Sequence, residues 1–223
     1  EGSYELRQRR YKAFDDAWAL YYSGKYREAA AAFETLVKNP GQMPVTMKPF
    51  ILNGLAWSRL GLREIVEAEK LFKASLQELP NGAEATAGIG LIAIERKEWE
   101  KAEKALMDAT AVLPGLPAVA EGFAALYSAR FGRYDQAWAL YNQGKYSDAV
   151  KAFEALLDKP GDLPASYLSF VRGAIGWSQL ALGQIDRAEN SFNRILPAAK
   201  MDEAEAKSGF GWIALRRNKV EQA

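Results

Sequence analysis

The sequence predicts an all-α solenoid, built from helix-turn-helix repeats that are grouped into two homologous triplets. The first observation is a repeat at an offset of 120 residues: residues 17–35 and 137–155 share 12 of 19 letters. Two further stretches then recur in the same order along the chain. The second observation is that apolar residues recur at helical spacing, without strand-like alternation. Such self-similarity indicates that each unit buries its apolar face only against its neighbours.

A shorter unit inside each triplet predicts a pair of helices. Each unit is marked by an alanine with bulky residues three before and four after it, a spacing that places them on one helical face. The alanines are Ala29, Ala68, Ala102, Ala149, Ala188 and Ala223. The bulky residues after them are Phe33, Phe72, Leu106, Phe153 and Phe192. Twelve residues before each alanine, in the first helix, a small residue allows close approach: Ala17, Ala56, Gly90, Ala137, Gly176 or Gly211.

Turn residues and prolines set the predicted ends of these helices. Glycine stands between the paired helices at Gly24, Gly144 and Gly183, where a tight turn needs a permissive backbone. Arg63, Lys97 and Asn218 take its place in the other repeats. Prolines are expected to close the second helices, because proline cannot continue a helix: Pro40, Pro80, Pro114, Pro160 and Pro197.

This pattern resembles the tetratricopeptide repeat, a helix-turn-helix unit of about 34 residues. The resemblance covers nearly the whole chain and implies a right-handed superhelix whose first helices line a concave surface. We expect repeats one to three, with an N-terminal helix, in residues 1–115. A linker helix and repeats four to six, the last one truncated, are expected in residues 116–223. The 13 extra residues before repeat four predict either an N-terminal extension of its first helix or a separate linker helix.

Composition excludes several classes of function. The chain carries 29 Lys and Arg against 28 Asp and Glu, so no net field favours nucleic acid as a partner. Histidine and cysteine are absent, which removes the usual metal ligands, thiol nucleophiles and the commonest general base. We therefore expect no enzyme activity, no cofactor and no metal. No apolar run approaches the roughly 20 residues that span a bilayer, so membrane insertion is not expected; cytoplasm and periplasm remain equally open.

Aromatic side chains on the first helices form the candidate binding site. A tryptophan directly follows the small residue in five of the six repeats. The resemblance implies that this row faces the concave groove and binds a peptide or helix. The candidate residues are Tyr11, Phe14, Trp18, Tyr21, Trp57, Phe131, Tyr134, Trp138, Tyr141, Trp177 and Trp212. The alternative is that the same aromatics are core and contact no ligand.

The predicted function is a protein interaction scaffold. Two alternatives are a self-assembling scaffold, which would be a homo-oligomer, and a glycan-binding envelope protein linked to polysaccharide export.

Other residues are expected to have structural roles. Gly88 to Gly90 and Gly209 to Gly211 are expected to serve close helix packing instead of nucleotide binding. Glu203 and Glu205 are expected to be solvated charges at the start of a helix. Because repeat six stops at Ala223, we expect a fragment of a longer protein. Its last repeat is expected to leave an apolar face partly uncovered: Phe210, Trp212 and Leu215.

Overall fold

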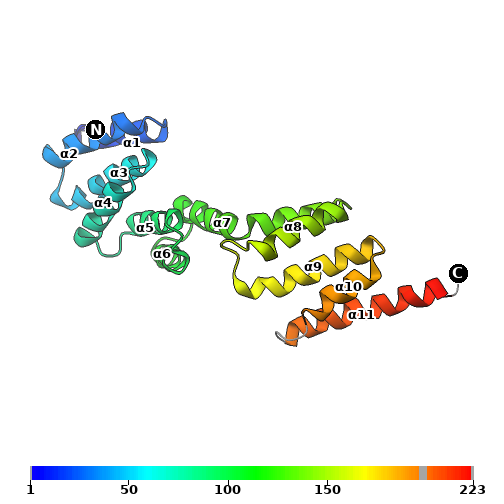
Figure 1. The fold of residues 1–223 in the computed structure, drawn as a ribbon. Coiled ribbons are helices and arrows are strands. Elements are labelled where there is room, and N and C mark those ends of the chain that lie inside the picture. Colours follow the sequence, from blue (N-terminus) through cyan, green and yellow to red (C-terminus); the bar gives the residue numbers. More distant parts are fainter. Residues whose placement is uncertain (1, 196–199, 222–223) are drawn as a thin grey trace. The chain divides into compact units, whose positions relative to one another are not determined.

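The computed structural model describes residues 2–195 and 200–221, and side-chain surroundings within residues 10–195 and 204–218. In these ranges the chain is helical without strands, which confirms the predicted all-α class (Figure 1). It divides into two compact units, residues 1–126 and 127–223. Unit 1 contains α1 (Gly2–Tyr22), α2 (Tyr26–Lys38), α3 (Lys48–Gly61), α4 (Ile65–Glu78), α5 (Ala83–Glu95), α6 (Trp99–Val112) and the start of α7 (Pro117–Asn142). Unit 2 contains the rest of α7, α8 (Tyr146–Asp158), α9 (Leu168–Ala181), α10 (Ile185–Asn193) and α11 (Lys200–Glu221).

The predicted turns between paired helices form in the first five repeats. Gly24 adopts a φ of +76°, in the left-handed region. Arg63 and Lys97 adopt the same conformation without being glycine, at φ values of 63° and 60°. A left-handed residue other than glycine costs about 1–2 kcal/mol, so the packing of the next helix must hold these turns. The second helices end before the prolines as expected, as α2 does at Lys38; Pro197 lies outside the described residues.

The loop between repeats one and two, and its counterpart in unit 2, carry extra residues that form short 3₁₀ turns. One turn, η1 (Val45–Met47), directly precedes α3, and the other, η2 (Ala165–Tyr167), directly precedes α9. In front of them, Met43 and Leu163 are buried against their units. The loops therefore add apolar contacts to the core.

The core is built from the bulky residue of each second helix, inserted between neighbouring first helices. Phe33 and Phe72 are fully buried. Each ring meets a glycine of the following first helix: an added Cβ would lie 2.4 Å from Phe33 at Gly54 and 2.3 Å from Phe72 at Gly88. These glycines are therefore sockets for the rings, and the close packing predicted at Gly88 is confirmed.

The socket position differs in the repeats that begin each triplet. It lies two residues before the small residue of the first helix, and in repeats one and four it holds Asp15 and Asp135. Both aspartates are exposed, and Tyr127 Oη donates a hydrogen bond to Asp135 Oδ1 at 3.3 Å. Leu106 of repeat three instead fits against Gly122, where an added Cβ would lie 2.5 Å from it. The first helices of repeats one and four therefore lack the glycine socket at this position.

Helix α7 accounts for the extra residues before repeat four. It runs without a break from Pro117 to Asn142, so the insertion extends the first helix of that repeat at its N-terminus. The division between the two compact units falls within α7, after Leu126. Val119 and Leu126 are buried in the part that belongs to unit 1. One continuous helix thus closes the first triplet and begins the second.

The predicted turn at Asn218 is wrong, because α11 continues through it to Glu221. Arg216, Arg217 and Lys219 are good helix formers, and no glycine interrupts them. Ala223, the expected alanine of the second helix, lies outside the described residues. On α11, Phe210 packs against the core of unit 2. Two apolar side chains remain exposed, Trp212 at 54% and Leu215 at 57%.

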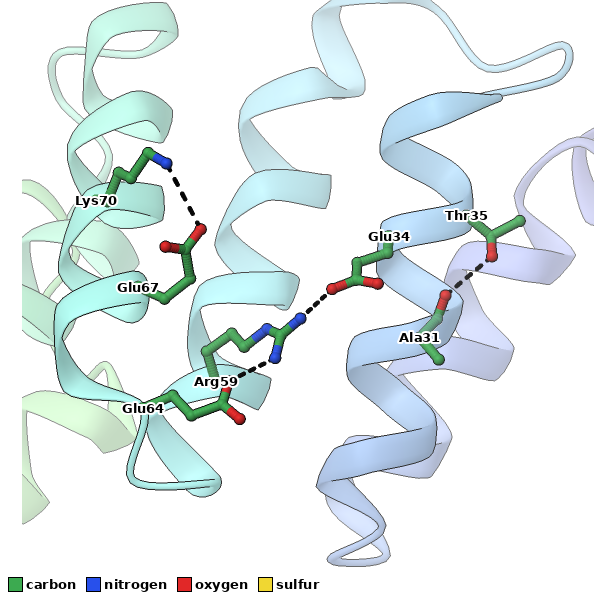
Figure 2. A network of polar contacts seen from close by, with 7 residues as sticks. All are labelled: Ala31, Glu34, Thr35, Arg59, Glu64, Glu67 and Lys70. Atoms are coloured by element: carbon green, nitrogen blue, oxygen red, sulfur yellow. Dashed lines mark hydrogen bonds and ion pairs between the residues drawn. The ribbon is translucent and has the colours of Figure 1, made fainter.

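Arginine–glutamate pairs join consecutive repeats. Arg59 of α3 binds Glu34 of α2 and, at 2.5 Å, Glu64 at the start of α4, as Figure 2 shows. The same kind of pair recurs at other junctions, each between an arginine at the end of a first helix and a glutamate of the preceding second helix. These pairs are Arg96 with Glu69 at 2.5 Å and Arg217 with Glu189 at 2.7 Å. They add polar contacts at the three junctions where they occur.

Candidate functional site

The predicted aromatic residues are half-buried, with the exception of the exposed Trp212. Each of four tryptophans meets the buried phenylalanine of its own repeat edge-on. The ring centroids are 5.3 Å apart for Trp18 and Phe33, 5.2 Å for Trp57 and Phe72, 5.4 Å for Trp138 and Phe153, and 5.1 Å for Trp177 and Phe192. One part of each indole therefore packs on the core, while another part stays accessible.

Unit 1 carries a cavity of about 370 Å³ that brings several predicted residues together. Its walls come from the first helices α1, α3 and α5 and from the start of α7, with Tyr26 from α2. The lining includes Trp18, Tyr21, Tyr22, Trp57, Glu84, Leu116, Pro117 and Glu121. The rings on α1 pack tightly: Trp18 and Tyr21 lie edge to face, with centroids 5.3 Å apart. This surface is thus an aromatic pocket with two carboxylates.

Glu84 is the more enclosed of these two carboxylates. Asn53 Nδ2 donates a hydrogen bond to Glu84 Oε2 at 2.6 Å. Burial raises the pKa of Glu84, and this hydrogen bond lowers it by a smaller amount. Asn53 itself is only 3% exposed, and its Oδ1 atom makes no hydrogen bond. The carboxylate therefore lies in apolar surroundings beside a neutral amide.

Tyr21 remains a neutral hydroxyl in this cavity. Burial raises its pKa to about 12, and the nearby Tyr26, Tyr22 and Glu121 add to the shift. The hydroxyl therefore keeps its proton over the physiological range. The charge of the cavity wall at neutral pH comes from its glutamates.

Unit 2 repeats part of this arrangement around Glu205. Glu205 occupies the position of Glu84, since both stand between alanines before a Gly-x-Gly. Trp177 Nε1 donates a hydrogen bond to Glu205 Oε1 at 3.3 Å. An added Cβ at Gly173 would lie 2.4 Å from the same oxygen. The expectation that Glu205 is a solvated helix-start charge is therefore wrong, because Gly173 leaves space for its side chain next to the indole.

A second cavity, of about 290 Å³, lies in unit 2. It is lined by Tyr141, Trp177, Leu180, Ala181, Trp212 and Arg216. Arg216 gives its wall a positive charge, whereas the cavity of unit 1 carries glutamates.

The close packing expected at Gly211 is not found, since an added Cβ there would meet nothing within 4 Å. At Gly209 the close packing is found, because an added Cβ would lie 2.6 Å from Phe192.

The remaining aromatic residues of the predicted row lie outside these cavities. Tyr11 and Phe14 pack on the core of unit 1. Phe131 lies against Tyr167 with centroids 4.9 Å apart, and Tyr134 and Trp138 pack on the core of unit 2. Helical spacing in the sequence thus predicted which aromatic residues lie on the first helices, but it identified neither Glu84 nor Asn53. The shared Ala-Glu-Ala at residues 83–85 and 204–206 was the signal for the carboxylates.

Other kinds of site receive little support. Among the described residues, no three His, Cys, Asp or Glu side chains gather closely enough to hold a metal ion. Within the same part of the chain, no helix has both the length and the hydropathy needed to cross a membrane. What the structure offers is a set of aromatic and charged surfaces on helical repeats.

Comparison with known proteins agrees with this class of helical repeat scaffold. The chain belongs to the tetratricopeptide repeat family, whose model matches residues 14–48, 53–115 and 134–179. Proteins of this family typically serve as scaffolds for protein interactions and are generally not enzymes. The sequence matches none of the curated proteins with which it was compared.

Solved structures that are similar to this chain share little sequence with it. A thermophilic tetratricopeptide repeat protein of Thermus thermophilus is 18% identical, with a TM-score of 0.44, and the match covers 90% of this chain and 98% of that one. A tetratricopeptide repeat protein of Parabacteroides merdae is 18% identical, with a TM-score of 0.43 over 91% and 85%. The protein MamA is 19% identical, with a TM-score of 0.39 over 90% and 95%.

Proposed function

We propose that this protein is a non-enzymatic scaffold that binds a peptide or helix of another protein on the aromatic surface of its first helices. The observation that supports this function is the cavity of unit 1, where Trp18, Tyr21 and Trp57 line one space. Tryptophan and tyrosine dominate binding hot spots because they bring a large, rigid contact area. The neighbouring first helices α1 and α3 thus place their aromatic rings where one ligand can contact both.

The same rings are held in place before any ligand arrives. Trp18 and Trp57 each pack edge-on against a fully buried phenylalanine, so their orientation is set by the core. Side chains that are already ordered lose little conformational entropy on binding, which otherwise costs about 0.5–1.5 kcal/mol each. This preorganisation favours a binding role in addition to the packing role.

The test uses a random-peptide display library as the probe, selected on the full chain. Affinities of the selected peptides are then measured by calorimetry for the wild type, Trp57→Ala and a matched control, Trp99→Ala. Trp99 is also half-buried but lies on α6, away from the cavity. We expect Trp57→Ala to weaken binding by about 2 kcal/mol or more and Trp99→Ala to leave it unchanged.

Two results would contradict the proposal. One is a failure of the library to yield any peptide that binds the wild type. The other is a set of peptides that bind Trp57→Ala as tightly as the wild type while both proteins are folded by circular dichroism. Mass that rises with protein concentration in the absence of peptide would instead favour self-assembly.

A further inference from the structure

The cavity of unit 1 has an electrostatic character that its aromatic walls alone do not explain. Glu84 and Glu121 both line it, and none of the described side chains in its wall is a lysine or an arginine. Several other glutamates of unit 1 are paired with cations, as Glu69 is with Arg96. Glu84 is bound instead to the neutral Asn53. The described wall of the cavity therefore carries two carboxyl groups and no cationic side chain.

We propose that this cavity binds a lysine or arginine side chain of the partner peptide, an inference that rests on the proposed function. The charged head would lie near Glu84 and Glu121, and the aliphatic stem would cover the rings of Trp18 and Trp57. Cations are attracted to the faces of tryptophan and tyrosine, most strongly where water is excluded. Lysine and arginine also bury their methylene stems readily on apolar surfaces. One type of side chain thus matches both halves of the site.

The helix dipole alone does not explain why a glutamate stands at Glu84 and at its counterpart Glu205. A glutamate in the first turn of a helix is favoured by the helix dipole, and Glu84 lies in the first turn of α5. Its counterpart Glu205, however, lies beyond the first turn of α11, which begins at Lys200. What the two glutamates share is a tryptophan, since Glu84 lines a cavity with Trp57 and Glu205 accepts a hydrogen bond from Trp177. The carboxylate beside an indole is therefore the repeated feature.

The surroundings of Glu84 leave hydrogen-bonding capacity for a cationic donor. Burial raises the pKa of Glu84, and no cation is among the causes of the shift. The carboxylate of Glu84 accepts one hydrogen bond, from Asn53 Nδ2, and has further acceptor sites. An ammonium or guanidinium group carries several N–H donors and no acceptor. Unit 2 provides a contrast, because Arg216 lines its cavity and would repel such a ligand.

The experiment uses the peptides selected on the full chain, each paired with a version in which its lysines and arginines are replaced by norleucine. Binding is measured for the wild type, for Glu84→Gln/Glu121→Gln, and for a control of equal charge change on α6, Glu100→Gln/Glu103→Gln. We expect a lysine or arginine in the selected peptides and a loss of about tenfold or more in affinity for the first double variant. The norleucine peptides should lose the same factor with the wild type and nothing further with that variant. The α6 control should change affinity less than twofold.

Failure of this inference is distinguishable from failure of the proposed function. Peptides that require Trp57, yet show neither a preference for lysine or arginine nor sensitivity to the cavity glutamates, would overturn only the cationic ligand. Peptides insensitive to Trp57→Ala would overturn both. Thermal unfolding of each variant verifies that it is folded, and Glu84→Asp, which keeps the charge, should retain more affinity than Glu84→Gln.

Discussion

Replacing Gly88 by alanine tests the socket that holds the repeats together. An added Cβ would lie 2.3 Å from the Phe72 ring, which is fully buried and is confined by Trp57 at a centroid distance of 5.2 Å. Overpacking of a filled core costs about 1–3 kcal/mol, and this contact is short enough to lie at the upper end. Alanine regains about 1 kcal/mol over glycine through helix propensity. We therefore expect Gly88→Ala to lower the free energy of unfolding by about 2 kcal/mol.

A matched control comes from Gly211, which also lies within a helix but has no atom within 4 Å of an added Cβ. Gly211→Ala should raise stability by about 0.5–1 kcal/mol, because only the propensity term remains. Both variants are compared with the wild type by urea unfolding, followed by circular dichroism and tryptophan fluorescence. Equal stabilisation by the two substitutions would refute the socket, since it would show that Phe72 moves aside at no cost.

Two further predictions concern charge and backbone strain. The hydrogen-bonded ion pair with Arg96 lowers the pKa of Glu69 to about 2, so its contribution to stability is full above a pH of about 4.5 and is lost as the pH falls towards 2. Glu69→Gln should therefore lower the free energy of unfolding by about 1 kcal/mol at neutral pH, after allowance for solvent screening. If the unfolding midpoints of the variant and the wild type still differ near pH 2, this explanation is contradicted. The backbone at Gly24 has a φ of +76°, so Gly24→Ala should lower the free energy of unfolding by about 1–2 kcal/mol. Arg63→Gly should raise it by up to about 1 kcal/mol, because glycine adopts this conformation without strain. A thermal melt in which Gly24→Ala is stabilising and Arg63→Gly is destabilising would disprove the left-handed turns.

The features that depend on local sequence were predictable. The turns at Gly24 and Arg63 follow from their place between two apolar helical faces, and they form where expected. The absence of a turn at Asn218 could not be predicted from the same pattern, because a turn forms only when the next helix packs back on the first. Residue spacing shows that such packing is possible, but it does not give the free energy of packing.

The candidate site was only half predictable for a related reason. Helical spacing shows that Trp18 and Trp57 lie on first helices, and the structure places both in one cavity. Glu84 belongs to a third helix, and in the sequence only the recurrence of Ala-Glu-Ala at residues 204–206 distinguishes it from other glutamates. Its burial and its contact with Asn53 depend on how α3 and α5 pack, which no local pattern encodes.

The exposed aspartates at the socket position bear on how such a chain could grow. A first helix with Asp15 or Asp135 lacks the glycine that receives a phenylalanine ring at Gly54 and Gly88. Single repeats could be added within a triplet, where glycine sockets such as Gly54 accept them. In front of Asp135 the chain carries the extended start of α7, whose Gly122 receives Leu106. The internal similarity at an offset of 120 residues thus relates two blocks that each begin with an aspartate at this position.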